Sequence, residues 1–183
     1  NEKTIGVIGY GSIGKAIASK AKTFGMRIIA TRRLQKKIEH KKSVDYLIPL
    51  ENLDFLLKES DYIIIACPLT KMTNGMIGEN EFNIMKKTSY IINIARGPIV
   101  DENFLIENLK KYKIAGAALD VFDEEPLPNN SELFQLDNVV LSPHISGNFP
   151  NYNDLVMNVF KENFLRFENG KLLKNRVCKK RLY

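Results

Sequence analysis

The stretch that decides the fold lies near the start of the chain and reads TIGVIGYGSIG over residues 4–14. Residues 4–8 are mostly apolar and β-branched, which is typical of a strand buried on both faces of a parallel sheet. In the GxGxxG pattern that follows, Gly9 permits a tight turn, Gly11 lets the backbone approach a pyrophosphate, and Gly14 lets a helix pack on the strand. That helix would offer free N–H groups and the positive end of its dipole to phosphates. The stretch predicts a dinucleotide-binding turn that includes Ser12 and Ile13.

A helix and a second strand follow this turn. Apolar residues recur at helical spacing at Ile17, Ala21 and Phe24, and Gly25 is suited to a helix C-cap. Another apolar run begins at residue 28, so the strand, turn, helix and strand form a βαβ unit of roughly 30 residues.

The same alternation continues along the chain. Apolar runs predict strands over residues 62–66, 90–94, 114–119 and 139–141, and helical spacing predicts helices over residues 53–58 and 101–111. Strands that alternate with helices predict an α/β fold, a Rossmann doubly wound parallel sheet with helices on both faces. We assign residues 1–147 to a dinucleotide-binding domain.

The pattern changes after His144. Residues 150–167 predict one long amphipathic helix, closed by Gly170, whose apolar stripe consists of Leu155, Val156, Val159, Phe160, Phe164 and Phe167. This stripe would either complete the core or pack against a partner domain or subunit. We expect residues 148–183, a C-terminal long helix and tail, to reach a substrate domain whose N-terminal part is absent from this chain. Because the chain starts at Asn1 rather than Met, we expect it to begin inside a longer polypeptide.

Charge and composition restrict the class of protein. The formal net charge is +6, and the positive charge is concentrated in residues 32–42 and in the tail at Lys179, Lys180 and Arg181. Neither cluster is interleaved with the aromatic side chains that stack on bases, so we expect solvated surface and no nucleic-acid partner. No apolar run approaches the roughly 20 residues of a membrane-spanning helix, and Cys67 and Cys178 form no CxxC pair. We expect a soluble, cytoplasmic protein with no membrane partner and no metal.

The residues after the second predicted strand bear on the choice of cofactor. NAD-binding proteins usually carry a carboxylate about 20 positions past the glycine loop, which accepts from the ribose 2′-hydroxyl. This chain instead has Thr31, Arg32 and Arg33 there. A guanidinium offers a planar fork of donors to a 2′-phosphate, so we predict a preference for NADP(H). The alternative is an exposed arginine pair in a protein that uses NAD(H).

Three further segments follow predicted strands, at the edge where open α/β sheets bind their ligands. They read NIARGP over residues 93–98, ALDVFDEEPLP over 118–128 and SPHISG over 142–147, and they supply Arg96, Glu125 and His144. A histidine, with a pKa of about 6.5, suits proton delivery to the alkoxide that forms when hydride reduces a ketone. A carboxylate on its other ring nitrogen would orient it, and an arginine would anchor an anionic substrate. Each residue alone has a structural explanation, but the three together at strand ends indicate a catalytic site.

On these residues the chain resembles the D-isomer-specific 2-hydroxyacid dehydrogenases. The blocks GYGSIG, CPLT, NIARGPIVDE, GAALDVFDEEPLP and SPHISG are similar to that family's blocks and follow its order, from about Thr4 to Gly147. The resemblance implies that Arg96 binds the substrate carboxylate and carbonyl, that Glu125 pairs with the histidine, and that His144 is the general acid/base. Besides the glycine loop and residues 31–33, it implies cofactor contacts at Cys67, Pro68, Thr73, Ile94, Ala95, Arg96, Asp120, His144 and Gly147.

The resemblance also implies an activity and an assembly. The expected activity is that of an NAD(P)-dependent oxidoreductase, which passes a hydride between a nicotinamide and a small 2-oxo acid to give the D-2-hydroxy acid, and the expected assembly is a homodimer. The formate dehydrogenase branch has glutamine where Glu125 stands, so we do not expect that activity.

Two departures from the family pattern matter, and a second hypothesis stays open. Arg32 replaces the common aspartate, and nothing corresponds to the N-terminal stretch that forms most of the family's substrate domain. The second hypothesis is a nucleotide-sensing interaction module like the dehydrogenase-related transcriptional corepressors, which retain the same catalytic residues.

Overall fold

A sheet of eight strands organises the first of two compact units. The computed structural model describes residues 3–178, and the units comprise residues 1–144 and 145–183. The strands are β1 (Thr4–Ile8), β2 (Arg27–Thr31), β3 (Glu39–Lys41), β4 (Val44–Ile48), β5 (Tyr62–Ile65), β6 (Tyr90–Asn93), β7 (Gly116–Leu119) and β8 (Val139–Leu141). Their order is β3-β4-β2-β1-β5-β6-β7-β8, with β3 antiparallel to β4 and the other pairs parallel. This arrangement confirms the predicted Rossmann fold.

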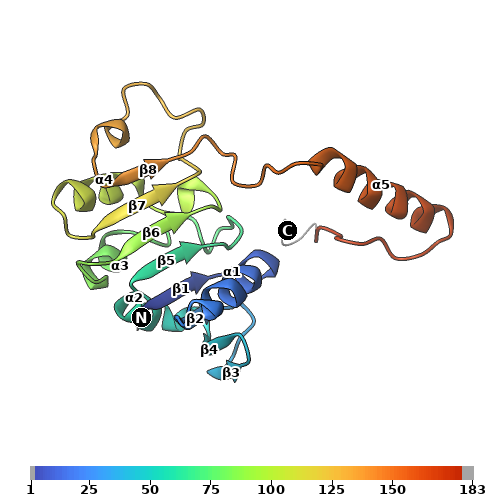
Figure 1. Ribbon diagram of the computed structural model, residues 1–183, viewed down its shortest axis with the longest axis horizontal. Coiled ribbons are helices and arrows are strands. Elements are labelled where there is room, and N and C mark those ends of the chain that lie inside the picture. The colour runs from blue at the N-terminus through green and yellow to red at the C-terminus, as the bar shows by residue number, and fades with distance from the viewer. Residues whose placement is uncertain (1–2, 179–183) are drawn as a thin grey trace. The chain divides into compact units, whose positions relative to one another are not determined.

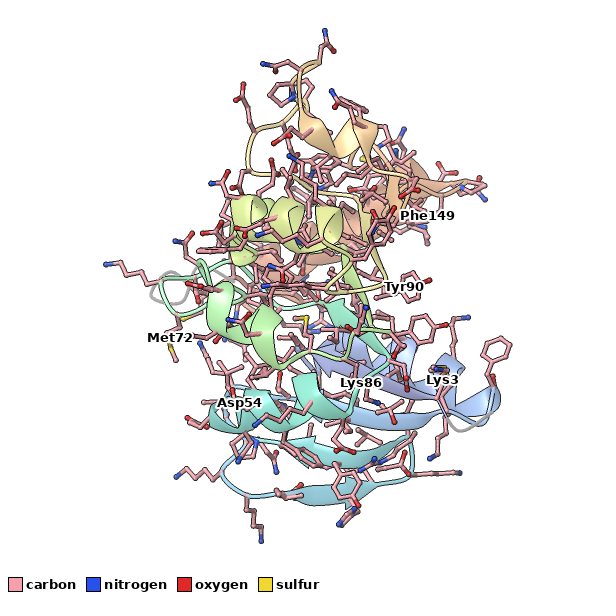
Figure 2. All side chains as sticks on the ribbon, turned by 90° about the vertical axis from the view of Figure 1, so that its left-hand side faces the viewer. Lys3, Asp54, Met72, Lys86, Tyr90 and Phe149 are labelled. Atoms are coloured by element: carbon pink, nitrogen blue, oxygen red, sulfur yellow. The ribbon has the colours of Figure 1, made fainter. Side chains whose placement is uncertain are left out.

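Helices cover both faces of this sheet (Figure 1). On one face, α1 (Ser12–Thr23) packs on β1 and β2, where Val7 and Ile28 belong to its core cluster. On the other lie α2 (Leu53–Glu59), α3 (Glu79–Ile84) and α4 (Glu102–Lys110), over the larger core cluster. Figure 2 looks onto these three helices and labels Asp54, which lies on the exposed side of α2. Short 3-10 turns occupy Leu50–Asn52, Gly97–Ile99 and Glu132–Gln135.

The face that α1 covers carries exposed apolar side chains farther along the sheet. Tyr62 and Tyr90 stand on neighbouring strands with stacked rings 5.8 Å apart, and Val140 of β8 is 69% exposed. These residues alternate with Ile63 and Ile91, which are buried under the opposite helices. Strands β5 to β8 therefore bury one face more completely than the other.

The elements β3, β4 and α3 were not predicted from the sequence. Strand β4 buries Val44, Leu47 and Ile48, but Asp45 stands among them because its carboxylate accepts from the Ile28 N–H at 2.8 Å. The other two elements, of three and six residues, are too short to establish a period.

One residue predicted for the apolar face of α1, Phe24, is exposed. Helix α1 ends at Thr23, and Phe24 is 76% exposed at the C-cap. Gly25, at φ +73°, then turns the chain toward β2, as a glycine after a helix commonly does.

The second unit contains α5 (Tyr152–Glu168), which matches the predicted long helix. None of its residues is buried, and its apolar stripe is exposed. The ion pair from Lys174 to Glu162 and the bond that Arg166 Nη1 donates to the Leu172 carbonyl at 3.1 Å tie the helix to the segment that follows Gly170. Within residues 3–178, none of the helices combines the length and apolar character needed to cross a membrane. The basic tail at residues 179–181 lies outside the described residues.

Candidate active site

The glycine turn joins β1 to α1 and is tied to the end of β2. Gly9 has φ +105°, which favours glycine, and its N–H donates to the Thr31 hydroxyl at 3.2 Å. The next N–H, of Tyr10, donates to the Thr31 carbonyl at 2.8 Å. A Cβ on Gly14 would lie 2.1 Å from the Gly9 carbonyl oxygen, so only glycine lets the helix pack this closely. Thr31 thus shapes the turn that the sequence predicted.

The N-terminus of α1 fits an anionic group. Gly11 is the N-cap, no side chain caps the helix there, and its first turn contains no acidic residue. A Cβ on Gly11 would meet no atom within 4 Å, so the space beside the backbone is open. Ser12 and Ile13 are exposed at this end. Free N–H groups and the positive helix end suit the pyrophosphate of a dinucleotide.

The two arginines after β2 are exposed at the same edge of the sheet. The Arg32 backbone N–H donates to the Ile48 carbonyl at 3.1 Å, and its side chain is exposed. Arg33 instead takes part in a pocket of roughly 540 Å³, whose lining is Arg33, Leu34, Gln35, Lys36, Pro49, Glu51 and Asn52. Two cations and one carboxylate therefore surround this pocket.

The turn after β5 lies against the glycine loop. A Cβ on Gly9 would be 2.8 Å from the Cys67 N atom. The buried Thr73 hydroxyl donates to the Pro68 carbonyl at 2.7 Å and accepts from the Thr70 N–H at 2.8 Å. Burial raises the pKa of the Cys67 thiol to about 11, so Cys67 stays neutral near pH 7. Thr73 therefore holds the shape of this turn, and Cys67 lies in it as a neutral thiol.

The turn after β6 carries Arg96 and packs against the loop after β7. Ile94 and Ala95 are partly and fully buried, whereas Arg96 is exposed and its Nη1 donates to the Ala95 carbonyl at 2.5 Å. A Cβ on Gly97 would lie 2.0 Å from the carbonyl carbon of Phe122. Glycine at this position thus lets the two backbones cross in direct contact.

Glu125 and His144 meet across the loops that follow β7 and β8. The Nδ1 atom of His144 lies 2.6 Å from Glu125 Oε2, and Glu125 Oε1 accepts from the Phe122 N–H at 3.1 Å. The bond from His144 is the main cause that lowers the pKa of Glu125 from its ordinary value of 4.5; burial opposes it, and the Arg96 charge contributes. An ionised carboxylate accepts from Nδ1–H, which leaves Nε2 available for an external group.

Ser142 and Asp120 support the histidine loop. The Ser142 hydroxyl donates to Asp120 Oδ1 at 2.5 Å, and the Ser142 N–H donates to the Leu119 carbonyl at 2.9 Å. His144 then adopts φ +53°, an uncommon value for a residue with a side chain, and its N–H donates to the Ser142 carbonyl at 3.0 Å. Ser142 was not predicted as a site residue, because its only signal in the sequence is its place after a predicted strand.

A pocket adjoins the Glu125–His144 pair. Its volume is roughly 550 Å³, and its lining is Phe122, Glu125, Pro126, Leu127, Phe134, Leu141, Ser142, Pro143 and His144. The lining is mostly apolar, and the two titratable groups stand at its wall. The structure thus brings Arg96, Glu125 and His144 to one edge, while Gly147 belongs to the second unit. Among residues 3–178, no group of three or more His, Cys, Asp or Glu side chains is arranged to hold a metal ion.

The part of the chain that carries this site matches a known protein family. Residues 1–146 match the model described as the NAD binding domain of D-isomer specific 2-hydroxyacid dehydrogenases. The chain belongs to this family. The match covers the glycine turn, Arg96, Glu125 and His144, and it confirms the family that the five sequence blocks predicted.

Curated members of the family are similar over nearly the whole chain. The glyoxylate reductase of Thermococcus gammatolerans is 47% identical over 170 residues, which are 93% of this chain and 50% of that protein. The glyoxylate reductase of Pyrococcus horikoshii is 46% identical over 171 residues, again 93% of this chain and 50% of the relative. The chain therefore spans about half the length of these curated relatives.

Solved structures of the family share the fold. A D-isomer specific 2-hydroxyacid dehydrogenase from Xanthobacter autotrophicus, in complex with NADPH and MES, has a TM-score of 0.90 and 33% identity, covering 99% of this chain and 73% of that one. An NADPH-dependent glyoxylate/hydroxypyruvate reductase from Sinorhizobium meliloti was solved in complex with NADP and sulfate. Its TM-score is 0.89 at 27% identity, and the match covers 99% of this chain and 57% of that one.

Proposed function

We propose that the whole protein is a nicotinamide-dependent reductase of small 2-oxo acids that forms the D-2-hydroxy acid, and that this chain carries its cofactor-binding and acid/base half. The observation that carries the proposal is the 2.6 Å contact between Glu125 and His144, with the charge of Arg96 acting on the same carboxylate. Glyoxylate, the substrate in the names of the curated relatives, is the first candidate substrate. The alternative of a nucleotide-sensing interaction module is not supported, because these relatives are named as reductases.

Each of the three side chains has one task in this proposal. Arg96 binds the substrate carboxylate and polarises the adjacent carbonyl with its planar fork of donors. His144 holds a proton at Nε2 and delivers it to the carbonyl oxygen as negative charge develops there. Glu125 keeps the imidazole oriented through its bond to Nδ1. When bound, the nicotinamide supplies the hydride for the carbonyl carbon.

The sharpest test of the proposal replaces His144 by Ala in the full-length protein. General acid/base catalysis typically contributes about 10²–10⁴-fold, so kcat for glyoxylate should fall by that order while the Kd for the cofactor stays the same. His40→Ala is a matched control, because His40 is the other histidine in the chain and lies on β3, outside the site. Undiminished turnover in His144→Ala would rule out the assigned role.

We also propose that the protein prefers NADP(H) to NAD(H). The exposed arginines after β2, with Lys36 beside Arg33, support this preference, and NADP(H) is named in the complexes of two structural relatives. Removing a hydrogen bond to a charged group costs about 1.5–3 kcal/mol. Arg32→Ala should therefore raise KM for NADPH at least about tenfold and leave KM for NADH almost unchanged. Equal increases for both cofactors, or a parent protein that favours NADH, would contradict the preference.

We propose a cytoplasmic homodimer without a nucleic-acid partner. In it, residues 1–147 bind the dinucleotide and residues 148–183 reach a substrate domain formed mainly by other residues. The family resemblance supports this division, and so does the match to about half the length of the curated relatives.

A further inference from the structure

Asn93 closes the turn that carries Arg96. It is the last residue of β6, and only 1% of its surface is exposed. Its Oδ1 accepts from the Ala95 N–H at 3.0 Å, and its Nδ2 donates to the Arg96 carbonyl at 2.9 Å. One buried amide thus bonds to the backbone on both sides of the Ala95–Arg96 peptide unit.

The opposite side of this turn is also fixed. Gly97 packs in direct contact with the Phe122 backbone, and the Ile99 N–H donates to the Arg96 carbonyl at 3.3 Å. The guanidinium itself is exposed, and it donates to Ala95, a carbonyl of the same turn. The direction of the Arg96 side chain therefore depends on the conformation of its own turn rather than on packing around its tip.

We infer that Asn93 is a positioning residue, which fixes the turn so that the Arg96 guanidinium faces the carboxylate of the 2-oxo acid. This inference rests on the proposed function. The two bonds need an acceptor and a donor on one short side chain, and Asn offers both, whereas aspartate is acceptor-only when ionised and leucine has neither. Arginine binds a carboxylate bidentately only in a narrow geometry, so a turn that relaxes by a fraction of an ångström weakens substrate binding.

A double-mutant cycle in the full-length protein, with NADPH and glyoxylate, tests the inference. Asn93→Ala should raise KM for glyoxylate about tenfold and change kcat less than about threefold. In an Arg96→Lys background, which lacks the planar fork, the same substitution should raise KM less than about twofold further, because the two residues act through one contact. If Asn93→Ala does not fold, Asn93→Ser, which keeps an acceptor for the Ala95 N–H, takes its place in the same cycle.

Asn108→Ala is the matched control for a purely structural role. Asn108 is also a buried asparagine, and its Nδ2 donates to the Phe104 carbonyl within α4 at 2.7 Å, outside the site. Asn108→Ala should lower the thermal midpoint and leave the KM for glyoxylate unchanged. An unchanged KM in Asn93→Ala, or effects on KM that multiply fully in the double mutant, would overturn the inference while the reductase activity stands. A parent protein that reduces none of glyoxylate, hydroxypyruvate and pyruvate with either cofactor would overturn the proposed function and this inference with it.

Discussion

At the scale of the residue, the carboxylate of Glu125 makes two bonds that act in the same direction. One oxygen accepts from His144 Nδ1 and the other from the Phe122 N–H. Both bonds favour the ionised carboxylate, and together with the charge of Arg96 they outweigh the burial that favours the neutral acid. Glu125 therefore keeps its negative charge opposite His144 throughout the pH range in which an ordinary glutamate is ionised.

Replacing Glu125 by Gln should remove a stabilisation that depends on pH. A carboxyl whose pKa is lowered by folding stabilises the folded state above its ordinary value, which is 4.5 for Glu125, and this contribution is lost as pH falls through the lower folded value. The thermal midpoint of Glu125→Gln should therefore lie below that of the parent at about pH 6, and the gap should close in stronger acid. Thermal unfolding followed by circular dichroism across this range measures the gap.

Glu124→Gln is the control for this titration, because it removes a negative charge one residue away. This variant should not show the pH-dependent difference in thermal midpoint from the parent. If the thermal midpoint of Glu125→Gln stayed below that of the parent by the same amount in strong acid, the lowered pKa of Glu125 would not be the cause of the difference.

At the scale of the element, the parallel register of three short strands brings the candidate catalytic residues together. Asn93, Leu119 and Leu141 are paired across β6, β7 and β8, so these strands end at the same level. Each next loop starts from that level and carries one group, namely Arg96, Glu125 or His144. Parallel strands present their carboxyl ends along one edge, which is why residues from distant segments converge there.

Helix α4 follows the Arg96 turn, and its start depends on Asp101. The carboxylate oxygen of Asp101 accepts from the N–H groups of Asn103 and Phe104, at 3.1 and 3.2 Å. Asp101→Ala leaves these donors without a cap and should lower the free energy of unfolding by about 1 kcal/mol. Asp101→Asn keeps a capping oxygen and should stay close to the parent in urea denaturation. An equal loss in both variants would mean that the negative charge, and not the cap, stabilises this helix.

At the scale of the whole molecule, the first unit gathers its candidate residues along a single edge of the sheet. Gly9 lies in the turn after β1, Thr31 ends β2 and Cys67 lies in the turn after β5. The Gly9 N–H donates to the Thr31 hydroxyl, and the Gly9 backbone packs against the Cys67 N atom. The loops after β6, β7 and β8 carry the candidate catalytic residues Arg96, Glu125 and His144. Because β1, β5 and β6 are neighbours in the sheet, a dinucleotide on the first group of turns would extend toward the second.

Much of this architecture could be predicted from the sequence because its signals are local. The buried run of residues 4–8, the glycines at 9, 11 and 14, and the apolar runs of β5 to β8 each reflect a period or a turn within a few residues. Strand β4 was not predicted, because Asp45, which accepts from the Ile28 N–H of β2, interrupts its apolar pattern. The identities of Arg96, Glu125 and His144 as candidates came from residue chemistry at strand ends, again a local signal.

Only the tertiary structure decided how these candidates are held. The contact between Glu125 and His144 joins residues 19 positions apart, and the crossing of Gly97 on Phe122 joins two separate loops. The Ser142 hydroxyl bonds to Asp120, which lies 22 positions earlier in the chain. The partners of Asn93 are close in sequence, but its two bonds depend on the conformation of the turn, which packs on Phe122 only in the folded chain. Local periodicity specifies which residues form a strand, but loop crossings follow from strand register and backbone packing, which are non-local properties.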